Sequence, residues 1–326
     1  MDRTHVARWP ALRVASWAET RSALHHYLQI IGKVQLALAP FRNHWWHLTL
    51  AVTTHGLTTG PMPTATGALE ISVDLVDHRV VLSTEDGSSA DFTLEAGLSC
   101  AAFHKQLLDL LKRAGITVKL SNRPYGLDSP PFPADDRPRP YNIDAIDRFR
   151  RALLRAMEAF TEFSGWFNGK TSPVQLHWHG LDLGLVRYSG RHATSPVEDS
   201  RIARESSSHE GLAFTFHPGD GNHPDATFAV STIPATWPSA SHQPLTPPEA
   251  RWTETGTTAL LAYDHVQTAG DGHRTLLRFF DDAYHGLARA AGWDVEDFAT
   301  SAALHADRAT GTPPSRRSAS SDGRTR

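Results

Sequence analysis

Gly32-Lys33 and His44-Trp45-Trp46-His47 lie in the stretch that indicates the fold most directly. An apolar run with helical spacing precedes the Gly-Lys pair, and an alternating, strand-like run follows the histidines. A weaker echo occurs in the second half of the chain, where Gly169-Lys170 is followed by His177-Trp178-His179. We therefore expect one helix-and-strand unit that is used twice, with imidazoles that could meet at a shared site.

Each half of the chain shows the same predicted order of a helix, several strands and a second helix. In the first half we predict helices at 17–32 and 100–114, with strands at 44–54, 69–76, 79–84, 90–94 and 116–120. In the second half we predict helices at 142–167 and 275–291, with strands at 174–179, 181–188, 211–217, 227–231 and 259–263. Gly32 is expected to end the first helix. The fold class is α+β, internally duplicated, with a mostly antiparallel sheet packed against helices.

A proline-rich segment, 121–141, separates the two units, because proline cannot sustain a helix or an interior strand. We expect 1–120 to form the first unit and 142–300 the second, packed together as one globule. Residues 301–326 are rich in Ser, Arg, Gly and Pro and are expected to be disordered.

Composition indicates a cytoplasmic globular protein with a small-molecule partner. The 326 residues are 40% hydrophobic and 21% charged, and the formal net charge of -3 predicts neither a nucleic-acid nor a membrane partner. The chain starts without an apolar signal segment, and its best apolar run is interrupted by Lys33 and Gln35. Cys100 is the only cysteine, so an intrachain disulfide and a Cys-rich metal site are excluded.

Histidine is unusually frequent, at 19 residues, and two segments suggest a metal site. His177 and His179 differ by two, so on a strand both imidazoles face one side and can reach one ion. His209-Glu210 places an imidazole beside a carboxylate just before a predicted strand. Such ligands suit a divalent metal, Fe or Zn, and the tentative metal set is His177, His179, His209 and Glu210.

The candidate catalytic residues are His44, His47, His209 and Glu210. Because His44 and His47 differ by three, a strand would point them to opposite faces, and only one could join a common site. The neighbouring Trp45 and Trp46 could line a ligand pocket or merely anchor a sheet to its helices.

The two Gly-Lys pairs follow helices instead of opening them, so neither forms a phosphate-binding loop of the Walker type. Lysine near a helix end complements the carbonyl groups there, which is the plain structural interpretation. Functionally, Lys33 and Lys170 together with Arg187 and Arg191 could bind a carboxylate or phosphate of a small substrate.

Several segments together resemble a bacterial family catalogued as domain of unknown function 5996, and the likeness covers about Trp9 to Trp293. Among them, Asn43 to His47 and Ser208 to Glu210 look like characteristic positions of the family. The resemblance implies no activity, and it implies aromatic residues at the positions of His177 and His179 in many members. The other segments that carry it are Leu24 to Lys33, Gly56 to Thr59, Gly169 to Val174 and Ser189 to Arg191.

Three functions remain open from the sequence. The first is an enzyme, of oxygenase or hydrolase type if it uses a metal, that acts on a small polar molecule through a His/Glu site between the two halves. The second is a non-catalytic ligand-binding protein with an aromatic-lined pocket. The third is a structural or partner-binding module whose histidines only satisfy local hydrogen bonds.

Overall fold

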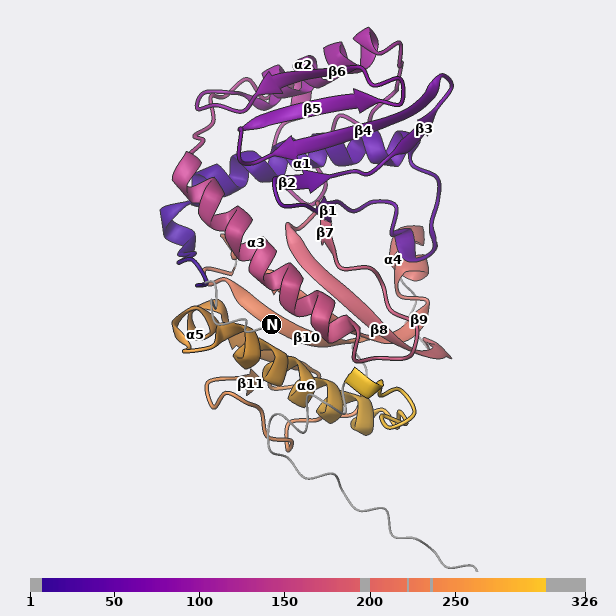
Figure 1. Cartoon of the computed structure of the whole chain (residues 1–326), viewed down its shortest axis with the longest axis vertical. Coiled ribbons are helices and arrows are strands. Elements are labelled where there is room, and N and C mark those ends of the chain that lie inside the picture. Colours follow the sequence, from indigo (N-terminus) through magenta and orange to yellow (C-terminus); the bar gives the residue numbers. More distant parts are fainter. Residues whose placement is uncertain (1–7, 194–199, 222, 235–236, 303–326) are drawn as a thin grey trace, which may run out of the picture.

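The computed structural model describes residues 8–193, 200–221, 223–234 and 237–302. It contains two antiparallel sheets with helices packed against them, one above the other in the view of Figure 1. The predicted α+β class is therefore confirmed. The predicted disordered tail lies outside the described residues, apart from Ser301 and Ala302.

The first sheet has the strand order β1-β2-β4-β5-β6, with β3 paired to β4 off this path. Buried and partly exposed residues alternate along β4, as expected for a sheet with one covered face. Two helices accompany it: α1 (Ala18–Leu38) contacts β3, and α2 (Cys100–Arg113) contacts β6. The strands are β1 (Ala51–Val52), β2 (Gly56–Thr58), β3 (Met62–Thr64), β4 (Gly67–Asp74), β5 (Arg79–Thr84) and β6 (Ser89–Thr93).

The second sheet has the order β11-β12-β10-β9-β8-β7. α3 (Ile143–Ser164) packs on β8, and α6 (Gly272–Ala290) packs on β9 and β10, so both helices bury their apolar stripes on this sheet (Figure 1). The strands are β7 (Gln175–His177), β8 (Asp182–His192), β9 (His209–His217), β10 (Thr227–Ile233), β11 (Arg251–Trp252) and β12 (Thr258–Ala262). The short helices are η1 (Val14–Ser16), η2 (Asn43–Trp45), η3 (Phe132–Ala134), α4 (Arg201–Ser206) and α5 (Tyr263–Thr268).

Side-chain caps fix where three of the long helices begin. Ser99, Asn142 and Asp271 each accept a hydrogen bond from the backbone N–H three residues later, which satisfies one of the free donors at a helix start. The predicted starts of α2 and α3 therefore agree closely with the structure, while α6 begins three residues earlier than predicted.

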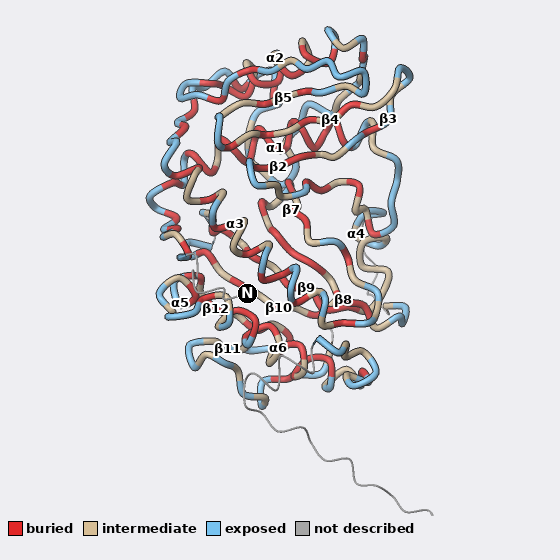
Figure 2. Tube along the Cα trace, viewed as in Figure 1, coloured by how far each residue is buried: buried red, intermediate tan, exposed pale blue. Residues whose placement is uncertain are grey.

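The two halves share a continuous hydrophobic core. Leu50 and Leu176 exchange backbone hydrogen bonds of 2.9 and 2.8 Å, which links the β1 edge of one sheet to the β7 edge of the other. α1 lies at this junction, and Figure 2 shows it buried along most of its length. Its buried residues include polar ones, so α1 carries side-chain chemistry into the junction between the halves.

Two predicted boundaries in the first half are wrong for physical reasons. α1 does not end at Gly32 but continues to Leu38. The glycine is needed for close packing, because a Cβ there would lie 2.2 Å from Cε2 of Trp178. The strand expected over 44–54 is reduced to β1, since His44 and Trp45 adopt left-handed φ values of 55 and 61°.

Other differences concern short elements. The segment 116–120 follows α2 as irregular chain without joining a ladder. The sequence did not predict some short elements, because two to six residues give too little periodicity to recognise; these are β2, β3, β11, α4 and α5.

The matched motifs of the two halves occupy different local structures. Gly32 lies inside α1, whereas Gly169 follows α3 in an irregular segment. His44 lies in the turn η2, whereas His177 ends the strand β7. The halves share helix-covered antiparallel sheets, and these elements do not show an internal duplication. Within the described residues, no helix has the length and apolar character needed to cross a bilayer.

Candidate functional site

The turn η2 carries His44 into the junction between the halves. Its left-handed conformation at two consecutive non-glycine residues is uncommon and costs backbone energy, which packing elsewhere must offset. The result is that the His44 side chain is only 8% exposed and stacks on Tyr188 of β8, with ring centroids 4.7 Å apart.

Both ring nitrogens of His44 have partners. Nδ1 lies 3.2 Å from the carbonyl oxygen of Ser206, to which it donates, and Nε2 lies 3.0 Å from Nζ of Lys170, from which it accepts. Burial lowers the pKa of His44, and the charge of Lys170 lowers it further, although the bond to Ser206 opposes the change. His44 is therefore a neutral imidazole at neutral pH.

His209 reaches the same place from the start of β9. Its ring centroid lies 5.5 Å from that of His44 and 4.6 Å from that of His192 on β8. Its Nδ1 lies 3.1 Å from Oγ of Ser208. The pKa of His209 is lowered, first by burial and then by the charges of His192 and Lys170.

Lys170 completes the group. Its ammonium lies 5.5 Å from the ring centroid of Trp46 and 5.1 Å from that of Tyr188, both within the range of cation–π attraction. In the part of the chain that the structure describes, no salt bridge joins Lys170 to a carboxylate. We call His44, Trp46, Lys170, Tyr188 and His209 the His44 site; it combines a cation with two imidazoles and has a surplus of positive charge.

The other members of the first histidine cluster turn away from this site. The His47 ring packs on Phe41 and Trp45, each 5.3 Å away between centroids, and its Nδ1 accepts a hydrogen bond of 3.3 Å from the backbone N–H of Arg42. Nε1 of Trp45 donates to Glu205 at 2.9 Å. Only His44 of the pair meets His209, although the chain forms the turn η2 here and not the strand on which the prediction rested.

Glu210 does not share the surroundings of His209. Adjacent residues on a strand face opposite sides. Oε1 of Glu210 accepts hydrogen bonds from Nε of Arg191 at 3.1 Å and from Nε1 of Trp293 at 2.6 Å. Arg191 also donates to the carbonyl oxygen of Ala291 at 2.8 Å. Glu210 and Arg191 thus tie the sheet to the chain after α6, and the structure does not place Glu210 beside His44 and Lys170.

A bulge in β8 produces this division. Tyr188 pairs with Gly211 and His192 with His209, so two extra residues of β8 are accommodated between these pairs. Gly190 takes a left-handed φ of 88° in the bulge, a conformation that suits glycine. The bulge lets His192 face His209 while Arg191 faces Glu210.

The predicted metal ligands do not gather in one place. His177 ends β7 and His179 lies in the following turn, with ring centroids 5.7 Å apart. The carbonyl oxygen of His179 accepts a hydrogen bond of 2.9 Å from Nε2 of His25 on α1. Burial lowers the pKa of His177 to about 4. Among the described residues, the predicted set of His177, His179, His209 and Glu210 does not form a group whose ligand atoms lie within 4.8 Å of one another.

Two of the predicted substrate-binding residues, Lys33 and Arg187, are buried against aromatic rings. Lys33 is 8% exposed on α1, with its ammonium 5.6 Å from the centroid of the Trp178 ring. Arg187 is 1% exposed; its guanidinium lies 3.6 Å from the ring centroid of Phe163, to whose carbonyl oxygen it also donates. Burial lowers the pKa of Arg187 to about 9. Neither cation is placed to meet a solvent-borne substrate.

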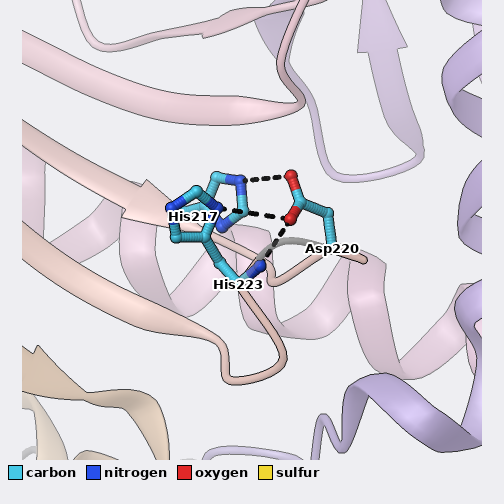
Figure 3. Close-up of side chains that lie close together, drawn as sticks. All are labelled: His217, Asp220 and His223. Atoms are coloured by element: carbon cyan, nitrogen blue, oxygen red, sulfur yellow. Dashed lines mark hydrogen bonds and ion pairs between the residues drawn. The ribbon is translucent and has the colours of Figure 1, made fainter. Parts of the chain in front are cut away.

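A second cluster lies in the loop at the end of β9, among residues that were not predicted as site residues from the sequence. Nε2 of His217 lies 3.4 Å from Oδ2 of Asp220, and Nδ1 of His223 lies 3.3 Å from Oδ1 of Asp220 (Figure 3). Among the described residues, this is the one group of three or more potential metal ligands whose ligand atoms lie within 4.8 Å of one another. In the sequence, the two histidines that flank an aspartate could have indicated this metal-ligand group. We call these three residues the His217 cluster.

Two charged residues from distant elements border the His217 cluster. Oδ1 of Asp182, at the start of β8, lies 3.7 Å from Nε2 of His217 and has no hydrogen-bond partner. Nη2 of Arg21 on α1 lies 4.0 Å from Oδ2 of Asp220. Burial and then the nearby charge of Asp220 raise the pKa of Asp182 to about 6, although Arg21 lowers it.

Comparison with known protein families assigns the chain to one family. A family of unknown function (DUF5996) matches residues 9–300. The protein belongs to this family. Comparison with curated proteins and with solved structures finds no match. Two of the segments that carry the resemblance to the family meet at the His44 site: Asn43 to His47 and Ser208 to Glu210.

Proposed function

We propose that this member of the family is an enzyme that acts on a small anionic molecule at the His44 site. The observation that carries the proposal is the contact of 3.0 Å between Nζ of Lys170 and Nε2 of His44, beside the ring of His209. In the described part of the chain, no carboxylate forms a salt bridge with this ammonium. A cation that meets only neutral rings attracts an anionic group of a ligand.

The two imidazoles have different roles in this proposal. His44 is held by Ser206 and Lys170, so it orients the ammonium, and the ammonium contacts the anion. Nδ1 of His209 contacts Ser208, and its Nε2 has no partner in the described part of the chain, so His209 is the group that transfers a proton. A neutral imidazole with a lowered pKa acts as a general base at neutral pH. The proposed roles of His44, Lys170 and His209 assign no step to a metal ion.

The test has a screening step and a mutational step. The full-length protein is incubated with mixtures of small phosphate, sulfonate and carboxylate compounds, and their consumption is followed by NMR and mass spectrometry. We expect one class to be consumed, and we expect His209→Asn and Lys170→Met each to reduce turnover by about a hundredfold or more. His47→Gln is the matched control, since this ring packs on Phe41 and Trp45.

The alternative is a ligand-binding protein that uses the same aromatic and cationic groups without catalysis. Trp46 and Tyr188, which flank Lys170, favour it. An anion that shifts the His44 and His209 imidazole resonances and is recovered unchanged would support the alternative. If none of the anions shifts these resonances, both functions are rejected for this site.

A further inference from the structure

We propose that the His217 cluster is a binding site for a divalent transition-metal ion such as Zn²⁺, with Asp182 as a second carboxylate nearby. The cluster shares no residue with the His44 site, and the proposal does not depend on the function proposed there. The ion would be held by one nitrogen from each of His217 and His223 and by a carboxylate oxygen of Asp220. Three protein ligands of this kind leave one position of a tetrahedral ion for water or a ligand.

The spacing of the ligand atoms supports this assignment. A tetrahedral Zn²⁺ with bonds of about 2.0–2.1 Å places its ligand atoms about 3.3–3.4 Å apart. The nitrogens of His217 and His223 lie 3.4 and 3.3 Å from the two oxygens of Asp220 (Figure 3). Small side-chain rotations would therefore bring all three residues onto one ion.

The balance of charge also favours a cation. Two carboxylates, Asp182 and Asp220, lie near His217, and the guanidinium of Arg21 approaches Asp220 at 4.0 Å. Oδ1 of Asp182 is buried without a hydrogen-bond partner.

Two contacts oppose binding and set its expected properties. The backbone N–H of Gly219 donates to Nδ1 of His217 at 3.1 Å, so the ring proton of neutral His217 lies on Nε2. A metal ion at Nε2 replaces this proton, and binding weakens as the pH falls. Arg21 competes for Asp220. Arg21→Gln is therefore expected to tighten metal binding, which a purely structural cluster would not predict.

The experiment uses the full chain, stripped of metal with a chelator and dialysed. Zn²⁺ is titrated by calorimetry, and Co²⁺ is added separately so that its visible absorption reports the coordination geometry. We expect one saturable equivalent of Zn²⁺, and we expect His223→Ala and Asp220→Asn each to weaken binding about tenfold or more. His223 is exposed, so its replacement should leave the thermal unfolding of the metal-free protein unchanged.

Because the chain contains 19 histidines, a control must separate this cluster from other imidazoles. His242→Ala removes an exposed histidine outside the cluster and should retain wild-type affinity for Zn²⁺. The proposal is overturned if no saturable equivalent binds, or if His223→Ala and Asp220→Asn bind Zn²⁺ as tightly as the wild type. Equal losses in His242→Ala and His223→Ala would also overturn it.

Discussion

Two lysine–tryptophan contacts join the halves of the molecule, and each uses one motif from either half. Lys33 of the first Gly-Lys pair lies over Trp178 of the second histidine cluster, at 5.6 Å. Lys170 of the second Gly-Lys pair lies over Trp46 of the first histidine cluster, at 5.5 Å. We call these the buried contact and the open contact, because Lys33 is buried and Lys170 is exposed.

The difference between the two contacts lies in what surrounds each cation. Around the buried contact, Gly32 removes a side chain so that α1 can approach the Trp178 ring closely. Around the open contact, His44 and His209 lie beside the ammonium, and the cation remains accessible to solvent. The same pair of residue types thus serves packing in one place and offers chemistry in the other.

The largest expected effect is a loss of unfolding free energy in acid, caused by His25 on α1 near the buried contact. Burial lowers the pKa of His25 from 6.5 to about 4, so this histidine stays neutral in the folded protein while the unfolded chain takes up a proton. The unfolding free energy therefore falls as the pH decreases from 6.5 to 4, by about 3 kcal/mol from this residue. Urea unfolding of wild type and His25→Gln, measured across this range, should show a shallower slope in the variant.

The exposed His242 provides the matched control for this prediction, and His242→Gln should keep the wild-type slope. If His25→Gln and the wild type lose stability equally with acid, the neutral state of His25 is not what the junction requires.

The next effect concerns the close approach at the buried contact. Gly32→Ala would place a Cβ 2.2 Å from Trp178, so the helix or the indole must move. We expect a loss of about 2–3 kcal/mol in unfolding free energy, although alanine normally stabilises a helix interior relative to glycine. Gly270→Ala, where nothing lies within 4 Å of the added Cβ, should change stability little. A stabilised Gly32→Ala would mean that the contact is loose.

A smaller effect tests whether Glu210, the neighbour of His209 on β9, contributes to anion binding near the open contact. Glu210→Gln weakens the bonds to Arg191 and Trp293 and should lower the unfolding free energy by about 1 kcal/mol, while leaving anion binding at the His44 site intact. His209→Asn should show the reverse pattern. Thermal unfolding measures the stability, and NMR titration with phosphate measures anion binding at the His44 site. If Glu210→Gln lost anion binding, Glu210 would have to be counted as part of that site.

The smallest change in stability is expected from the lysines themselves. Lys33→Met removes a buried cation whose pKa is lowered by burial, and it should alter the unfolding free energy by about 1 kcal/mol or less. Lys170→Met should leave stability unchanged but raise the pKa values of His44 and His209, because the charge of Lys170 lowers both. NMR pH titration of the two imidazoles measures this. Unchanged pKa values in Lys170→Met would show that the charge of Lys170 is not coupled to the two imidazoles.

Local pattern was enough to predict the long elements. The predicted strand 79–84 coincides with β5, and α3 was placed within a few residues of its observed ends because it combines an Asn142 cap with a long apolar stripe. Short elements and left-handed turns were missed, since η2 and α4 depend on partners supplied by the rest of the fold.

The candidate site was only partly predictable. His44, Trp46, Lys170 and His209 were all singled out by residue type, and they do meet. Glu210 was misplaced because sequence adjacency on a strand separates side chains to opposite faces. The His217 cluster was not predicted, although its three residues lie in one short segment and two histidines flank an aspartate there. The bordering Asp182 and Arg21 belong to other elements, and spacing along the chain cannot reveal them.

The sequence by itself determined the α+β class, the long helices and strands, and the residue types available for chemistry, because these follow from local periodicity, capping and composition. Only the tertiary structure decided which Gly-Lys pair is buried and which lies beside two imidazoles. The physical reason is that His44 and Lys170 are brought together by core packing between halves of the chain, and no local pattern encodes that packing.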